Sequence, residues 1–200
     1  SGTSTLNIGT SGIEVESGNG GATLAVSNLT LGGDQSWTNN SANPLTVSAA
    51  TVNGGAYWLT LTGSGAVHLG GTSLSATGID VLTNLDLKGT SITAGFGDST
   101  GNITNTGAAN ATITANIVSD AGLSGVISDS GSGSAITLTK SGTATLTLSG
   151  ANTYSGGSNV ANGTLRAGND SAFGSGAVNI TSATGVLDLN GKTVANAINN

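Results

Sequence analysis

Short pairs of apolar residues, separated by one small or polar residue, recur from one end of the chain to the other. An alternation with a period of two places both members of a pair on the same face of a β-strand. The pattern therefore predicts many short strands, each with one apolar face, and no helix. The clearest pairs are Leu6/Ile8, Ile13/Val15, Leu24/Val26, Leu29/Leu31, Leu45/Val47, Leu59/Leu61, Val67/Leu69, Ile79/Val81, Leu85/Leu87, Ile136/Leu138, Leu146/Leu148, Val178/Ile180 and Leu187/Leu189.

Clusters of glycine, serine and asparagine separate these pairs, for example at residues 17–21, 63–65 and 156–159. Sandwiches, barrels and solenoids are all built from short strands and turns. A core supplied by Leu, Ile, Val and Ala suits a narrow tube in which each coil stacks on the coil below. At ~20 residues per coil, residues 1–200 are expected to form one all-β segment, a β-solenoid of about ten coils within a longer chain. Residues 119–134, rich in glycine and serine, are expected to form an irregular coil or a protruding loop.

The composition narrows the class of protein further. Charged residues make up 7% of the chain and aromatic residues 3%, and glycine occurs 34 times, whereas an ordinary soluble domain carries about 25% charged residues. Long helices need charged and amide side chains on their faces, so a helical or α/β enzyme is excluded. The net charge is −6, and four Lys and Arg cannot form the basic surface that nucleic acid requires. No apolar run approaches the ~18 residues of a membrane span, so this segment is not expected to insert into a membrane.

One pattern of a catalytic type occurs in the sequence. Residues 97–101 read Gly-Asp-Ser-Thr-Gly and match G-x-S-x-G, a motif that requires a strand-to-helix turn and a histidine partner. The one histidine of the chain, His68, lies in a predicted strand, and no helix is expected after Ser99. We therefore interpret residues 97–101 as a turn and predict no catalytic residue.

Metal and cofactor sites have little support either. One histidine without cysteine does not make a zinc site, and Asp188 with Asn190 offers too few carboxylates for tight calcium binding. No complete G-x-G-x-x-G motif cradles a nucleotide. We predict no metal and no cofactor. The acidic residues are dispersed, apart from Glu14 and Glu16, which argues against a polysaccharide-active enzyme with converging carboxylates.

The two tryptophans are the remaining candidates for contact with a ligand. In the stretch from Tyr57 to Thr62, alternation places Tyr57 inward with the leucines and leaves Trp58 on the outer face. An outward indole could stack on a sugar or on a partner protein. It could also simply cover a loop or the surface of the next coil. Trp37, in a turn-rich stretch, has the same two interpretations.

The C-terminal third carries a motif that resembles a known family. Residues 138–165 read Leu-Thr-Lys-Ser-Gly-Thr-Ala-Thr-Leu-Thr-Leu-Ser-Gly-Ala-Asn-Thr-Tyr-Ser-Gly-Gly-Ser-Asn-Val-Ala-Asn-Gly-Thr-Leu, and Gly-Ser-Gly-Ala-Val follows at 174–178. This closely resembles the autotransporter-associated β-strand repeat, or passenger-associated transport repeat, of bacterial surface proteins, and the likeness extends over residues 134–200. Ala144 stands where glycine is usual, and Ser158-Asn159 replaces a threonine pair. The resemblance implies a right-handed parallel β-helix exported to the cell surface.

Together these features favour a non-catalytic structural segment of an extracellular or cell-surface protein, acting as a stalk, fibre or adhesin scaffold. An adhesin module that binds a glycan or host protein through an exposed flank is the second interpretation, and a polysaccharide-active β-helix enzyme is the third. The expected partners are neighbouring coils of a longer chain, or other copies that associate through the solenoid ends. Inward positions of the stacked coils are expected at Leu146, Leu148, Leu165, Val178, Ile180, Leu187 and Leu189.

Overall fold

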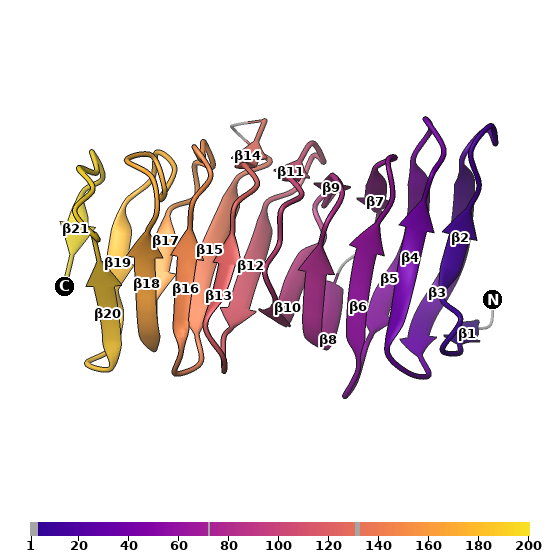
Figure 1. Ribbon diagram of the computed structural model, residues 1–200, viewed down its shortest axis with the longest axis horizontal. Coiled ribbons are helices and arrows are strands. Elements are labelled where there is room, and N and C mark those ends of the chain that lie inside the picture. Colours follow the sequence, from indigo (N-terminus) through magenta and orange to yellow (C-terminus); the bar gives the residue numbers. More distant parts are fainter. Residues whose placement is uncertain (1–3, 72, 131–132) are drawn as a thin grey trace.

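The protein is a parallel β-solenoid, as the sequence predicts. A computed structural model describes residues 4–71, 73–130 and 133–200, and this part of the chain contains strands and turns but no helix. Figure 1 shows the strands stacked side by side along one long axis, with the two termini at opposite ends. Every strand pairing within the described residues is parallel, because each turn of the chain repeats the direction of the turn before it.

Each turn crosses three stacks of strands, which we call face 1, face 2 and face 3. Face 1 is built by β1 (Thr5–Ile8), the second halves of β3 (Ala22–Leu31) and β5 (Leu45–Asn53), the first parts of β8 (Ser73–Val81) and β10 (Ser91–Phe96), β12 (Ala111–Asn116), β15 (Ile136–Ser141), β17 (Ser158–Val160), β19 (Val178–Ile180) and β21 (Ile198–Asn199). Face 2 is built by β2 (Ile13–Val15), β4 (Gln35–Asn39), β6 (Trp58–Thr62), the ends of β8 and β10, β13 (Ala121–Leu123), β16 (Thr145–Leu148), β18 (Gly163–Ala167) and β20 (Gly185–Asp188). Face 3 is built by the first halves of β3 and β5, β7 (Val67–Leu69), β9 (Leu85–Asp86), β11 (Ile103–Asn105) and β14 (Ile127–Asp129).

Register along face 1 gives the number of turns. The described residues complete nine turns, one fewer than the ten coils expected from an even repeat. The turn from Leu74 to Ile92 takes 18 residues and the turn from Ile113 to Leu138 takes 25, whereas the last three turns take 20 each. The partners in register are Leu6, Leu29, Val52, Leu74, Ile92, Ile113, Leu138, Ser158, Val178 and Ile198.

The core is a column of aliphatic side chains inside the tube. Leu146, Leu148 and Leu165 are fully buried, as expected from the alternation, because parallel register places each inward side chain on the one below it. Val178 is also buried, and Ile180 and Leu187 are partly buried. Leu189 is exposed instead, because β20 ends at Asp188 and the alternation no longer directs the side chain inward.

The structure also corrects the expectation of an irregular coil or a protruding loop at residues 119–134. The described part of this stretch contains β13 and β14, which pair with neighbouring turns on faces 2 and 3. Ala121, Leu123 and Ile127 are buried. The small residues between them lowered the apolar density of the sequence without removing the inward positions.

Carboxylate and amide side chains connect successive turns where the strand ladders break. Asp34 Oδ1 accepts a hydrogen bond from Trp58 N at 2.8 Å, and Asp98 Oδ1 accepts one from Gly122 N at 2.8 Å. Buried or bent backbone must find such partners, because an unpaired N–H group is costly. The same type of bond joins Asn102 to Val126, Asn110 to Ala135, Asp120 to Thr145 and Asp170 to Thr193.

Adjacent residues of β15 test the inward and outward assignment. Leu138 is fully buried and Thr139 lies on the outer side. Leu138→Asp is expected to remove most of the stability, because an unpaired carboxylate in an apolar interior costs several kcal/mol. Thr139→Asp is expected to change the free energy of unfolding by about 0.5 kcal/mol or less. Urea unfolding followed by circular dichroism measures both, and equal losses would contradict the assignment.

Candidate binding surface

The serine of the G-x-S-x-G pattern holds two turns together. Ser99 is buried and bridges to Leu123 on face 2. Its Oγ accepts a hydrogen bond from Val81 N at 2.9 Å and donates one to Gly97 O at 3.4 Å. His68 lies in β7 on face 3, so the serine and the histidine are on different faces of the tube. Residues 97–101 contain no helix, but the turn interpreted from the sequence is corrected: the segment has a bend and a β-bridge at Ser99 and bonds to the turns on both sides.

The environment of His68 is that of a half-buried surface residue. It pairs in register with Thr46 on the preceding turn and with Asp86 on the following one. Burial lowers the pKa of His68, and the nearby Asp86 carboxylate partly opposes this shift. Of these two register partners, Asp86 is the residue of a metal-ligating type, and other groups already bind its carboxylate. Groups of three or more His, Cys, Asp or Glu that could hold a metal ion are absent from the described residues.

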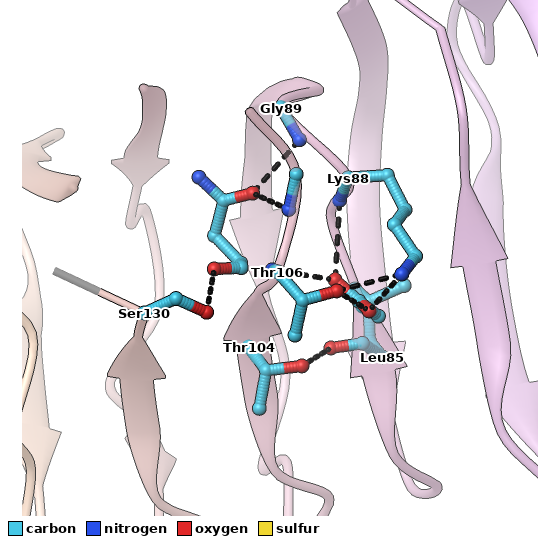
Figure 2. A network of polar contacts seen from close by, with 9 residues as sticks. Leu85, Lys88, Gly89, Thr104, Thr106 and Ser130 are labelled. Carbon is cyan, nitrogen blue, oxygen red and sulfur yellow. Dashed lines mark hydrogen bonds and ion pairs between the residues drawn. The ribbon is translucent and has the colours of Figure 1, made fainter. Parts of the chain in front are cut away.

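A polar network on face 3 occupies that carboxylate (Figure 2). Asp86 Oδ2 lies 3.1 Å from Lys88 Nζ and accepts a hydrogen bond from Thr106 Oγ1 at 2.6 Å, while Asp86 Oδ1 accepts one from Thr106 N at 3.0 Å. Burial alone would raise the pKa of Asp86, but the bonds from Thr106 and Lys88 outweigh burial and lower it. Asn105 Oδ1 accepts bonds from Gly89 N and Gly107 N in the same network. With Ser130, whose Oγ donates to Asn105 O, the network joins three turns, and the lowered pKa keeps Asp86 ionised at neutral pH.

A second polar surface lies on face 2. Asp98, Asp120 and Arg166 line a hollow of about 260 Å³. Asp98 and Asp120 each accept a backbone hydrogen bond from the next turn, and Arg166 Nε is paired with Asp188 Oδ2 at 2.7 Å. That bond from Arg166 lowers the pKa of Asp188. Each of these carboxylates thus holds a backbone or guanidinium group of another turn.

Trp37 is inside the tube, so it offers no exposed ring, which was one of its two interpretations. Its side chain is fully buried in β4, and its Nε1 donates a hydrogen bond to Gln35 Oε1 at 2.9 Å. Gln35 in turn donates from Nε2 to Gly9 O at 3.1 Å. The indole fills the core between Ile13 and Leu61, its register partners, and the buried amide satisfies its one polar atom.

Trp58 does lie on the outer side of face 2, as the alternation predicts. It begins β6, and the residue is 37% exposed. Tyr57, expected to point inward, precedes the strand and is exposed instead. Trp58 borders two hollows. One of about 360 Å³ is also lined by Ser11, Asp34 and Thr60, and a smaller one of about 140 Å³ lies on the Phe96 and Val118 side.

The residues after β16 explain the recognisable motif of the C-terminal third. Asn152 Oδ1 accepts a hydrogen bond from Ile127 N at 2.8 Å, and its Nδ2 donates to Ala172 O at 2.6 Å, so one buried amide joins three successive turns. Tyr154 is fully buried, with its hydroxyl 2.7 Å from Ser158 Oγ. Gly157 has a φ of 78°, a conformation that favours glycine.

Comparison with known proteins assigns this motif. The family model described as passenger-associated-transport-repeat matches residues 138–167. The matched segment is therefore similar to a passenger-associated transport repeat. A stretch of 55 residues is 51% identical to the adhesin BmaC autotransporter of Brucella suis biovar 1 (strain 1330). The match covers 27% of this chain and 2% of that protein. No solved structure matches the chain, and no helix long and apolar enough to cross a membrane occurs in the described residues.

The passenger repeat also contains a buried charge that sequence reasoning missed. Lys140 is fully buried at an inward position of β15, in register with Ala115 and Val160. Its Nζ donates hydrogen bonds to Ser141 O at 2.7 Å, to Gly142 O at 2.9 Å and to Asn162 O at 3.0 Å. An ammonium group has three N–H donors, and all three are used. An assignment of inward positions from apolar residues alone passes over Lys140. Alternation continued from Leu138 places Lys140 on the same, inward side of the strand.

The buried Lys140 is expected to make the free energy of unfolding depend on pH. Burial lowers the pKa of Lys140 to about 8, although the charge of Asp120 opposes the shift. An unfolded lysine has a pKa of about 10.4, so between these values the unfolded chain binds a proton that the folded chain has released. Stability contributed by this group therefore rises with pH across that window. Urea unfolding at pH 7.5 and pH 10 is expected to show this rise in the native protein and its loss in Lys140→Met. An equal change in both proteins would contradict the assignment.

Proposed function

We propose that this chain is a non-catalytic scaffold segment of a bacterial surface adhesin of the autotransporter type. The observation that carries the proposal is the passenger-associated transport repeat at residues 138–167, set within nine turns that continue the same core. The similarity to part of an adhesin autotransporter supports export and adhesion. A tube of stacked turns gives length with a short repeat, because each turn supplies the hydrogen-bond partners of the next.

The buried and paired state of the candidate chemical groups favours a scaffold over an enzyme. Ser99 bonds to a neighbouring turn, and Asp86 is held by Lys88 and Thr106. Lys140 donates to three carbonyl groups inside the tube. A catalytic site needs such groups to converge where a substrate can reach them. Here they connect turns, so their role is structural.

Surface display tests the scaffold proposal in the full-length protein. An epitope tag inserted at the exposed turn that contains Gly18 and Asn19 is expected to be labelled by antibody on intact cells of the source bacterium. Leu138→Asp in the tagged protein is expected to reduce labelling strongly, because an unfolded turn interrupts the tube. A tag that is labelled only after the cells are permeabilised would overturn the proposal.

The ends of the described solenoid favour association with further turns. Among the described strands, β1 pairs with β3 and β21 pairs with β19, each on one side. Leu6 and Ile198 on these strands are 37% and 46% exposed. Unpaired strand edges pair readily with other strands. In the full-length protein we expect neighbouring coils to cover them, and in the isolated segment we expect head-to-tail contacts between copies.

Sedimentation of the isolated 200-residue segment tests this second part of the proposal. The average mass is expected to increase with concentration, and Leu6→Lys combined with Ile198→Lys is expected to reduce that increase, because two charges would oppose strand pairing. Val118→Lys is the matched control, since Val118 is 75% exposed but lies outside the strands. A monomer at all concentrations, or an equal effect of the control, would contradict association through the ends.

A further inference from the structure

The exposed indole of Trp58 lies flat on the neighbouring turn. A Cβ atom built on Gly78, its register partner in β8, would lie 2.3 Å from Trp58 Cε2 and 2.4 Å from both Cδ2 and Cζ2. These three atoms belong to the six-membered ring, and a point equally close to all three lies above its centre. The ring therefore covers the outward side of Gly78 face-on. Trp58 is nevertheless 37% exposed, so part of the indole remains accessible to solvent.

A carboxylate lies at the edge of this ring. A Cβ atom built on Gly97, in the turn after Gly78, would lie 2.0 Å from Asp80 Oδ1 and 3.4 Å from Trp58 Cζ3. Asp80 therefore extends over a glycine backbone next to the indole edge. On the other side, Asp34 Oδ1 accepts a hydrogen bond from Trp58 N, which holds a second carboxylate beside the same residue. Glycine at 78 and 97 keeps the surface around the ring free of other side chains.

The larger hollow beside the ring has the size and lining of a small-ligand site. Its volume is about 360 Å³, within the range of roughly 300–1,000 Å³ that is typical of ligand sites. Ser11, Ser36 and Thr60 contribute hydroxyl groups, and Asp34 contributes a carboxylate. Hydroxyls donate and accept hydrogen bonds, whereas an ionised carboxylate accepts only. The lining thus combines one apolar plane with many acceptors.

We infer that Trp58, Asp34 and Asp80 form a binding site for a neutral saccharide, with one pyranose ring stacked on the indole. A pyranose has a face of C–H groups and a rim of hydroxyl donors, which matches a flat aromatic surface bordered by carboxylates. The surrounding negative charge disfavours uronic acids, sialic acids and nucleic acids. An organic cation would be better held by several aromatic rings around one charge, and here a single open ring is present. A scaffold without ligand would still satisfy the proposed function, so the two can fail separately.

Tryptophan fluorescence tests the site directly in the folded segment. The chain has two tryptophans; Trp37 is buried, so a change in emission on adding ligand reports Trp58. Cellohexaose, chitohexaose and maltohexaose serve as neutral probes, polygalacturonate as an anionic probe and choline as a cationic probe. We expect saturable quenching or a shift to shorter wavelength with at least one neutral probe, and none with polygalacturonate or choline.

Variants separate binding from folding, and calorimetry measures affinity where the fluorophore is removed. Trp58→Ala is expected to lower the affinity for the neutral probe at least tenfold. Asp80→Asn is expected to lower it severalfold, since a hydroxyl of the sugar loses a charged acceptor. Gly78→Ala is expected to weaken binding too, because the new methyl group displaces the ring. Tyr57→Ala is the matched control, an adjacent exposed aromatic outside the hollow, and should bind normally.

Several outcomes would overturn the inference. One is that protein with a normal circular dichroism spectrum binds none of the three neutral probes. Another is that a folded Trp58→Ala variant binds the neutral probe with unchanged affinity. Equal binding of choline or of polygalacturonate would assign the surface to a different ligand. Loss of affinity in Tyr57→Ala as large as in Trp58→Ala would indicate a general effect on the surface rather than this site. Surface labelling of the full-length protein tests the proposed function independently of these binding results.

Discussion

Backbone hydrogen bonding between successive turns is the constraint on which the rest of this structure depends. Each turn leaves N–H and C=O groups pointing along the tube, and only the turns before and after can satisfy them. Inside the tube, the same stacking places aliphatic side chains in register, from Leu29 through Leu74 and Ile113 to Leu138. Hydrogen bonding and apolar burial therefore repeat together once per turn. Few charged residues are needed, since neither interaction requires them.

Corners are where this constraint is hardest to meet, and polar side chains meet it there. The backbone bends out of the ladder, and an amide or carboxylate from the neighbouring turn supplies the missing partner, as Asp34 does for Trp58 N and Asn152 for Ile127 N. Lys140 extends this principle to the interior by donating to three carbonyl groups at once. No buried side-chain nitrogen or oxygen of the described residues lacks a partner. The buried polar side chains of the described residues are thus part of the structural framework.

The sequence predicts the class of fold and most of the core, because inward positions alternate with polar ones and each strand can be interpreted by itself. It predicts less where an inward position is polar or the strand begins late. Trp37 lies between Gln35 and Asn39, which are also buried, so the apolar alternation that identifies a core residue is absent around it. Alternation places Tyr57 inward only if it extends one residue before the start of β6, and the strand does not reach that far. Lys140 could have been found from its spacing to Leu138. The position of Trp58 was predicted, whereas its orientation over Gly78 depends on a residue 20 positions away and required the register of two turns.

That register also connects the scaffold to the surface it carries. A residue on the outer side of one turn has as its neighbours not the adjacent residues of the sequence but the register partners about twenty residues away. A glycine at such a partner leaves backbone exposed, and a large ring on the previous turn can lie across it, as Trp58 does on Gly78. The indole is then fixed by the same stacking that holds the core. An aromatic plane positioned this way is rigid without a loop to support it, and a rigid plane loses little entropy when a ligand stacks on it. The stacking that gives the tube its length therefore also fixes side chains on its outer faces. A substitution at an outward position can change what such a face binds without altering the interior.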